Sequence, residues 1–458
     1  MSSMNEVKLL AVNGQLGYGF PESSFLEGMS RKPDLVGVDG GSTDGGPYYL
    51  ASGKSLTGKK GVKRDLSLIL PAVLKEKIPF VIGTASTAGG EPHVKTTLDI
   101  LKELAAEKGY RFRVAIIHSE VDKNYVKQKL RQGKVKPLGS HVPQLTEEEI
   151  DKSIRIVGQM GVTPFIRALD YNTEVILAGR SCDTAIFAAL PIKKGLDPGL
   201  SFHAAKIMEC GAYAAEPGSA SDSIWAVIRQ KDFILDSLNP KRRCTPVSVA
   251  AHTMYEQGDP TKFYEPDGLV DYTDAQFEQY NETAVRVWGA KHIPAKGKWT
   301  IKLEGAALEG YRTISIVGSR DPILIKNVDT LMAKVTEEVE ANLGPQEDEG
   351  YAINYRVYGK NAILRDLETE PCMSHEIGIV IDVVARNQEL ANSVCAIVRS
   401  SILHYHYPDR KTTGGNVAIP FSPADIPVGP VYRFNVYHTV EVDDPNDLFP
   451  IEIVEVGK

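Results

Sequence analysis

Short apolar runs alternate with helical patterns over the first 200 residues of the chain. The runs VKLLAVNG, DLVGVD, PFVIGTA, RFRVAIIH, TPFIRALD and EVILAGR are typical of buried strands. Between them, KRDLSLILPAVLKEK, EPHVKTTLDILKELAAEKG and TEEEIDKSIRIVGQMG have the spacing and end signals of helices. Strands that alternate with helices predict βαβ units and a mostly parallel, Rossmann-like sheet.

The pattern changes near residue 200. From KWTIKLEGAALEGYRTISIVGSRDPILI onward, apolar and polar positions alternate as in paired, half-exposed strands, and two long helical patterns follow. We therefore expect an α/β fold with two domains. Residues 1–200 would form the Rossmann-like domain that carries the glycine-rich loops, and residues 201–458 an α+β domain that closes a cleft or forms an interface. Half-exposed strands also favour a homo-oligomer.

Polar clusters follow five of the predicted strands. A parallel sheet binds its ligands beyond the carboxyl ends of its strands, so these clusters should meet on one rim. They are DGGSTDGG, TASTAGGEPH, HSEVDKN, LDYNTE and GRSCDTA.

The glycine-rich cluster after the second strand is the densest of the five. Successive backbone N–H groups can cradle an anion, and hydroxyls add donors. The alternative is a tight crossover in which backbone packs on backbone. Two carboxylates in the segment also leave open a divalent cation. The candidates are Asp39 as a catalytic carboxylate and, as anion ligands, Gly40, Gly41, Ser42, Thr43 and Asp44.

The clusters after the third and fourth strands offer donors and an acid/base pair. Thr84, Ser86 and Thr87 precede a helix and predict an anion site at its N-terminus, unless they only cap the helix or its turn. His118 and Glu120 would point to one face if the strand continued. That arrangement suits general acid/base catalysis, or the start of a metal site whose third ligand is not visible.

Further candidates surround the sixth strand and the helix beyond it. Arg180 and Ser181 are expected to bind a substrate carboxylate, and Asp183 is a catalytic candidate or a helix cap. His203 and Lys206 share one stripe of a predicted helix, where the lysine would serve as base or carboxylate anchor and the histidine would bind substrate.

Composition narrows the classes of function. The net charge of −7 argues against a nucleic-acid-binding face, and no apolar segment of about 18 residues suggests a membrane span. The five scattered cysteines form no CxxC pair, so we expect a reduced cytoplasmic protein without a disulfide framework.

Several segments together resemble the acyclic-terpene-utilisation family AtuA. They are GVDGGSTDGGPYYLASG, SVAAHTMYEQGDP, KLEGAALEGYRTISIVGSRDP, ARNQELANSVCAIVRSSILHYHYPDRKTTGGNVAIPFSP and GPVYRFNVYHTVEVDDPNDLFPIE. The resemblance implies a catabolic protein that acts beside acyl-CoA carboxylation and hydration enzymes, in some systems with a small companion subunit. It transfers no catalytic residues.

The chain lacks a GxSxG elbow, a dinucleotide fingerprint, an HExxH pair and a P-loop. Its inventory of hydroxyls, carboxylates, histidines and one lysine suits proton transfer on a small branched carboxylate or its CoA thioester. We therefore predict a lyase, either a hydratase or dehydratase or a C–C lyase. The alternatives are a hydrolase with Cys182 or Ser86 as nucleophile, and a non-catalytic scaffold of an acyl-CoA pathway.

Overall fold

The computed structural model describes residues 6–370 and 374–457, which form two compact units. The first unit comprises Met1–Ala307 and Phe434–Lys458, and the second comprises Leu308–Arg433. The borders fall inside two long strands, β17 (Trp299–Ser319) and β20 (Asp425–Val442).

A ten-stranded sheet is the centre of the first unit. Its five middle strands run parallel, and antiparallel strands extend it on both sides. The order is β14 (Gln276–Gln279), β15 (Ala284–Trp288), β10 (Phe233–Ser237), β9 (Ile224–Ile228), β1 (Val7–Ala11), β2 (Leu35–Asp39), β3 (Phe80–Gly83), β7 (Val175–Ala178), β4 (Phe112–Ile117) and β21 (Ile451–Val456).

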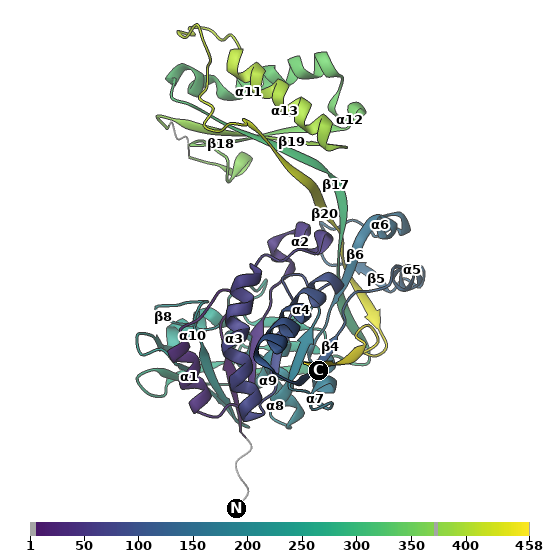
Figure 1. Cartoon of the computed structure of the whole chain (residues 1–458), viewed down its shortest axis with the longest axis vertical. Helices are drawn as coiled ribbons and strands as arrows, with labels where there is room; N and C mark the ends of the chain where they lie inside the picture. The colour runs from purple at the N-terminus through teal and green to yellow at the C-terminus, as the bar shows by residue number, and fades with distance from the viewer. Residues whose placement is uncertain (1–5, 371–373, 458) are drawn as a thin grey trace, which may run out of the picture. The chain divides into compact units, whose positions relative to one another are not determined.

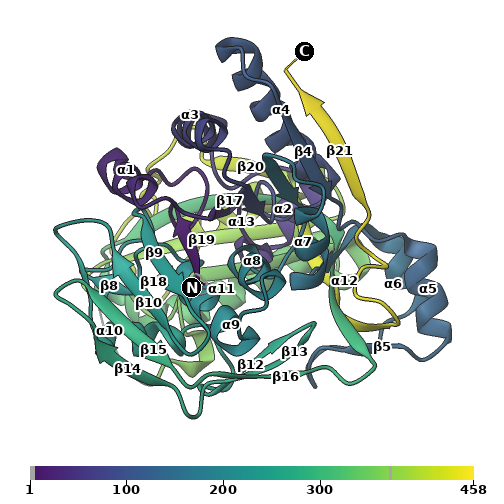
Figure 2. The ribbon, with the colours of Figure 1, turned by 90° about the horizontal axis from the view of Figure 1, so that it is seen from below.

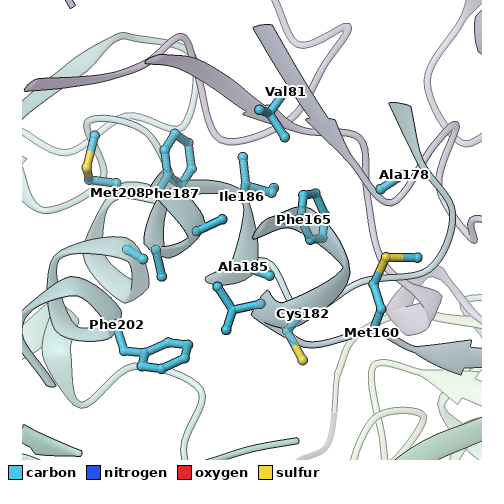
Figure 3. Close-up of a cluster of buried hydrophobic side chains, with 14 of the residues drawn as sticks. Val81, Met160, Phe165, Ala178, Cys182, Ala185, Ile186, Phe187, Phe202 and Met208 are labelled. Atoms are coloured by element: carbon cyan, nitrogen blue, oxygen red, sulfur yellow. The ribbon is translucent and has the colours of Figure 1, made fainter. Parts of the chain in front are cut away.

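Helices cover both faces of this sheet (Figures 1 and 2). One face carries α1 (Glu22–Ser30), α3 (Lys59–Glu76) and α4 (Glu91–Lys108), and the other carries α7 (Val162–Leu169), α8 (Ala185–Lys193) and α9 (Pro198–Met208). Successive strand residues alternate between the two apolar cores, as the two-residue period of a strand requires. Leu9 and Leu35 join the core under α8, whereas Leu10 and Val36 join the core under α3. Figure 3 shows part of the α8 core, with Phe165, Ile186 and Phe187.

Smaller elements complete the first unit. Two minor sheets have the orders β11–β8 and β12–β13–β16, while β6 pairs with β17 and β5 with β20. Their bounds, with those of the remaining helices, are β5 (Val135–Pro137), β6 (Ser153–Gln159), β8 (Ala215–Glu216), β11 (Arg243–Cys244), β12 (Lys262–Glu265), β13 (Gly268–Asp271), β16 (Lys291–Pro294), η1 (Thr43–Gly45), α2 (Pro47–Ser52), α5 (Lys123–Arg131), α6 (Glu147–Lys152) and α10 (Pro246–Thr253).

The second unit is an antiparallel sheet with its own apolar core. Strand β19 (Ile377–Ala385) lies between β18 (Tyr351–Tyr358) and β17. Helices α11 (Pro322–Leu343) and α13 (Gln388–His404) contribute to the same core as these strands. The short elements α12 (Gln346–Glu349) and η2 (Arg365–Leu367) complete the unit.

The predicted α/β class is confirmed, with two local corrections. TPFIRALD was expected to be a strand but forms α7, because its apolar residues recur at the helical spacing and bury one side. TEEEIDKSIRIVGQMG was expected to be one helix, but α6 ends at Lys152 and β6 begins at Ser153, where Ile156 and Val157 enter the core.

The compact units divide the chain elsewhere than the expected border near residue 200. Strands β9, β10 and β15 extend the first sheet beside β1, so residues up to 307 belong with the first unit. Within the described residues, none of the helices has the length and apolar character needed to span a bilayer. The four described cysteines form no disulfide, and Cys372 lies outside the described residues.

Candidate functional site

The first two glycines of the glycine-rich segment pack against the loop that follows β3. A Cβ on Gly40 would lie 2.6 Å from the Gly83 carbonyl oxygen, and one on Gly41 would lie 2.5 Å from the Thr87 Cα. The Gly40 N–H donates to the Gly83 carbonyl. These two glycines therefore serve a backbone-on-backbone crossover that sets Asp39, the last residue of β2, at the carboxyl end of the sheet.

The loop after β3 is strained. Thr84, Ser86 and Thr87 have positive φ angles of 33°, 45° and 90°, which β-branched and other non-glycine residues rarely adopt. Hydroxyl contacts hold them there: Ser86 with Thr97 at 2.8 Å, and Thr87 accepting from the Leu56 N–H at 2.8 Å. Backbone strain of this kind gathers at functional sites, where the surrounding structure maintains it.

A buried ion pair lies beside this loop. The Arg180 Nε donates to Glu304 Oε2 at 2.7 Å, and the Thr43 hydroxyl donates to Glu304 Oε1 at 2.7 Å. Lys302 Nζ lies 2.8 Å from the same Oε1. Although burial opposes ionisation, Arg180 and Lys302 lower the pKa of Glu304 to about 2. Arg180 is thus a permanent cation whose charge is balanced within the protein.

Two carboxyls, Asp39 and Asp183, lie close to this ion pair, and the charge of Asp183 acts on Asp39. Burial and then the charge of Asp183 raise the pKa of Asp39 well above its ordinary value. Burial also raises the pKa of Asp183, although Arg180 and Lys206 oppose that rise. Asp39 Oδ1 and Asp183 Oδ1 are buried and have no hydrogen-bond partner among the described residues. The Asp183 side chain nevertheless keeps 32% of its surface exposed, so it is the accessible member of the pair.

A lysine and two further acids adjoin Asp183. Lys206 Nζ lies 2.6 Å from Glu209 Oε1 and 5.8 Å from the centre of the Tyr255 ring. Although burial opposes its charge, the Glu209 carboxylate raises the pKa of Lys206. Burial raises the pKa of both Glu209 and Glu265 to about 8. The site thus combines a lysine ammonium with more carboxyls than it can ionise together at neutral pH.

Comparison with known families gives one match. The family model described as acyclic terpene utilisation family protein AtuA matches residues 58–418. The chain belongs to the AtuA family. No curated protein and no solved structure matches the chain. The AtuA match begins after the glycine-rich segment, so Asp39 lies outside it and Arg180, Asp183, Lys206 and Glu304 lie within it.

Several hydroxyls predicted as anion donors in this AtuA protein are engaged by the protein itself. The Thr84 hydroxyl donates to the Ser181 carbonyl, and the Ser181 hydroxyl accepts from the Thr84 N–H. Ser42 bonds the Asp44 carboxylate at 2.9 Å, and Thr43 is committed to Glu304. Asp44 nevertheless stays close enough for its charge to raise the pKa of Asp183.

His118 and Glu120 have other partners than the Asp39–Asp183 pair. His118 Nδ1 lies 2.9 Å from Glu91 Oε1, and this contact raises the pKa of His118. Glu120 accepts from Arg155 Nε at 2.9 Å. The predicted residues therefore lie in two separate polar groups, one around Asp39 and Asp183 and the other around His118 and Glu120.

His203 is buried behind Lys206. Its ring centre lies 4.5 Å from that of Tyr272, and its Nε2 lies 2.9 Å from the Thr253 hydroxyl. Burial lowers the pKa of His203 to about 3, so the ring is neutral. His203 therefore packs inside the protein against Tyr272 and Thr253 and is not exposed to a substrate.

The described residues contain no group of three or more His, Cys, Asp or Glu side chains arranged to hold a metal ion. Asp39 and Asp44, for which the sequence left a divalent cation open, belong to no such group among the described residues. Burial raises the pKa of the Cys182 thiol well above its ordinary value, which keeps it protonated.

Sequence reasoning missed Glu304, Lys302 and Glu265. Glu304 and Lys302 stand two apart in an alternating strand, so they share a face, and a charged pair on one face of such a strand was the available signal. Glu265 gave no signal, because its burial depends on packing between β12 and the turn before α8.

Proposed function

We propose that this AtuA protein is a lyase that moves a proton at the carbon next to a carboxylate or thioester carbonyl. The observation that carries the proposal is the Asp39–Asp183 pair. Both pKa values are raised by burial, the charge of Asp183 raises that of Asp39 further, and each carboxyl keeps one oxygen without a hydrogen-bond partner among the described residues. Two such carboxyls can supply an acid and a base in one place. The substrate would be a small branched carboxylic acid, free or as its CoA thioester.

The two carboxyls would have different roles. Asp183 is more exposed, and the charges of Arg180 and Lys206 oppose the rise of its pKa, so it would be the base that removes the α-proton. Asp39 is more buried and feels the charge of Asp183, which favours its neutral form, so it would be the acid. In a dehydration, Asp183 takes the α-proton, the C–O bond at the β-carbon breaks, and Asp39 protonates the departing hydroxyl to give water.

Lys206 is the candidate for holding the substrate oxygens. Its ammonium is charged and shared only with Glu209 among the described partners, and it attracts negative charge at Asp183. An ammonium next to the reacting carbon would stabilise the enolate that proton removal creates.

A hydrolase with a cysteine or serine nucleophile has less support. The Cys182 thiol is 8% exposed and protonated, and a protonated thiol is a poor nucleophile. Ser86 bonds Thr97, and no histidine base contacts it through a described hydrogen bond. A scaffold role would leave the unpartnered oxygens of Asp39 and Asp183 without a purpose, whereas a small companion subunit is compatible with the proposed lyase.

Proton exchange tests the proposal before the natural substrate is known. The purified protein is incubated in D₂O with branched β-hydroxy acids and their enoyl counterparts, free and as CoA thioesters, and α-deuterium is followed by NMR. We expect Asp183→Asn to lose about 10²–10⁴-fold in exchange. Asp39→Asn should keep exchange but lose elimination.

Asp99→Asn, which changes an exposed carboxylate paired with Lys95 on α4, is the matched control. It should exchange at the wild-type rate. Wild-type exchange that survives in Asp183→Asn would exclude Asp183 as the base.

A further inference from the structure

The buried carboxyl of Glu265 contacts the residues next to Asp183, and the proposed reaction gives it no role. Glu265, at the end of β12, is 7% exposed. One of its oxygens accepts from the Thr184 hydroxyl, and its carboxyl also bonds the Cys182 thiol. Cys182 and Thr184 are the residues on either side of Asp183, so Glu265 holds the turn that presents Asp183.

The other oxygen of Glu265 has no hydrogen-bond partner among the described residues. Two other buried polar atoms nearby share this condition: the Tyr272 hydroxyl and His203 Nδ1. Burying a polar atom without a partner costs about 1–3 kcal/mol, so three such atoms in one region need a reason.

The three atoms are complementary in hydrogen bonding. The Thr253 hydroxyl donates to the Val249 carbonyl at 3.0 Å, so it must accept from His203 Nε2. Nδ1 of the neutral ring is therefore an acceptor, whereas a tyrosine hydroxyl can donate and accept and a protonated carboxyl can donate. A Tyr272 hydroxyl that donated to Nδ1 could only accept from Glu265, and Glu265 could donate to it only while it carries a proton.

We propose that Glu265 is a positioning residue for Asp183 that holds a proton in the folded protein, with the unpartnered buried polar atoms of Tyr272 and His203 nearby. This inference rests on the proposed function for its effect on turnover. Release of the proton would put a second negative charge beside Asp183 and against the developing enolate, so turnover should fall when Glu265 ionises.

The surroundings of Glu265 agree with a retained proton. Burial raises the pKa of Glu265 to about 8, and the charges of Asp267 and Asp183 act in the same direction, while the Thr184 hydroxyl opposes them. The titratable groups around it are Cys182, Asp183, Glu209, Asp267, Tyr272, His203 and Lys206, whose ammonium lies 5.5 Å from the centre of the Phe263 ring in the same strand. Lys206 is the cation among them, and its ammonium is paired with Glu209 at 2.6 Å rather than with Glu265.

Protein stability provides a test that does not need turnover. Between pH 4.5 and 8 the unfolded chain loses the Glu265 proton and the folded chain keeps it, so stability should fall as the pH rises through this window. Glu265→Gln cannot ionise at this position, so its melting temperature should fall by several degrees less than that of the wild type between pH 4.5 and 8. Thr184→Val removes the opposing hydroxyl and should extend the fall to higher pH.

Turnover provides the second test. The wild-type rate should show an alkaline limb near pH 8 that disappears in Glu265→Gln and moves to higher pH in Thr184→Val, with KM little changed. Glu209→Gln is the comparison, since losing the partner of Lys206 should instead raise KM.

An unchanged stability slope in Glu265→Gln would overturn the proposal, whatever the activity. If Glu265→Gln changes the dependence of stability on pH but leaves the fall of the turnover rate near pH 8 unchanged, the link between Glu265 and Asp183 is overturned. If the wild type exchanges no α-proton with any substrate, the proposed function fails, and the stability slope still decides whether Glu265 holds the proton.

Discussion

At the scale of single residues, the site depends on how charge is shared among buried groups. Arg180, the first charged residue after β7, is neutralised by Glu304 from β17, and Lys302 adds a second cation to the same carboxylate. Breaking a buried ion pair leaves an uncompensated charge, which costs about 3–5 kcal/mol. The Arg180 charge held in this group lowers the pKa of both Asp39 and Asp183 and so opposes the effect of burial on them.

Glu304→Gln should therefore destabilise the protein at pH 7 by about 3–5 kcal/mol. The folded-state pKa of about 2 lies below the ordinary 4.5, so the Glu304 charge stabilises the fold above pH 4.5 and is lost as the pH falls toward 2. Thermal melts should show a smaller loss of stability across that window in the variant than in the wild type.

Glu147→Gln is the control, because Glu147 forms an exposed pair with Arg131. Exposed ion pairs contribute little to stability, so its melting curve should stay close to that of the wild type. Equal effects of the two substitutions would show that the Arg180–Glu304 pair does not stabilise the fold.

At the scale of elements, the site is built where two loops cross without side chains between them. The segment after β2 can approach the strained loop after β3 only through glycine. Gly41→Ala should destabilise the protein by about 1–3 kcal/mol, since φ is +137° and the new Cβ would meet the Thr87 backbone. Urea denaturation measures the change.

Gly58→Ala is the matched control for that substitution. Gly58 has φ of −71°, and a Cβ at this position would have no other atom within 4 Å, so alanine should be tolerated. A wild-type denaturation curve for Gly41→Ala would contradict the crossover.

The same elements explain what the sequence could and could not predict. Apolar runs and end signals were sufficient for β1–β4, β7, α3 and α4. The rule for parallel sheets puts Asp39 and Asp183 on one rim, and in the structure the charge of Asp183 acts on Asp39. The pattern around β6 was misjudged, because that strand pairs with β17, which lies far away along the chain. Glu265 and Glu304 enter the site by long-range packing of this kind, which local spacing does not record.

At the scale of the whole molecule, the chain has separate cores. Two apolar clusters flank the ten-stranded sheet of the first unit, and a third lies between the sheet and the helices of the second unit. None of the three clusters of described residues mixes the two units. Units with separate cores can open separately, each with its own free energy.

Ile381→Ala tests this division. Ile381 is fully buried in β19, so its truncation should cost about 2–5 kcal/mol. Amide hydrogen exchange should accelerate in β18, β19, α11 and α13 and stay at wild-type rates in β1, β2 and β3. Leu35→Ala, at an equally buried position in β2, is the matched variant and should give the reverse pattern. If either substitution accelerates exchange equally in both units, the chain unfolds as one cooperative body, and β17 and β20 transmit the loss between the cores.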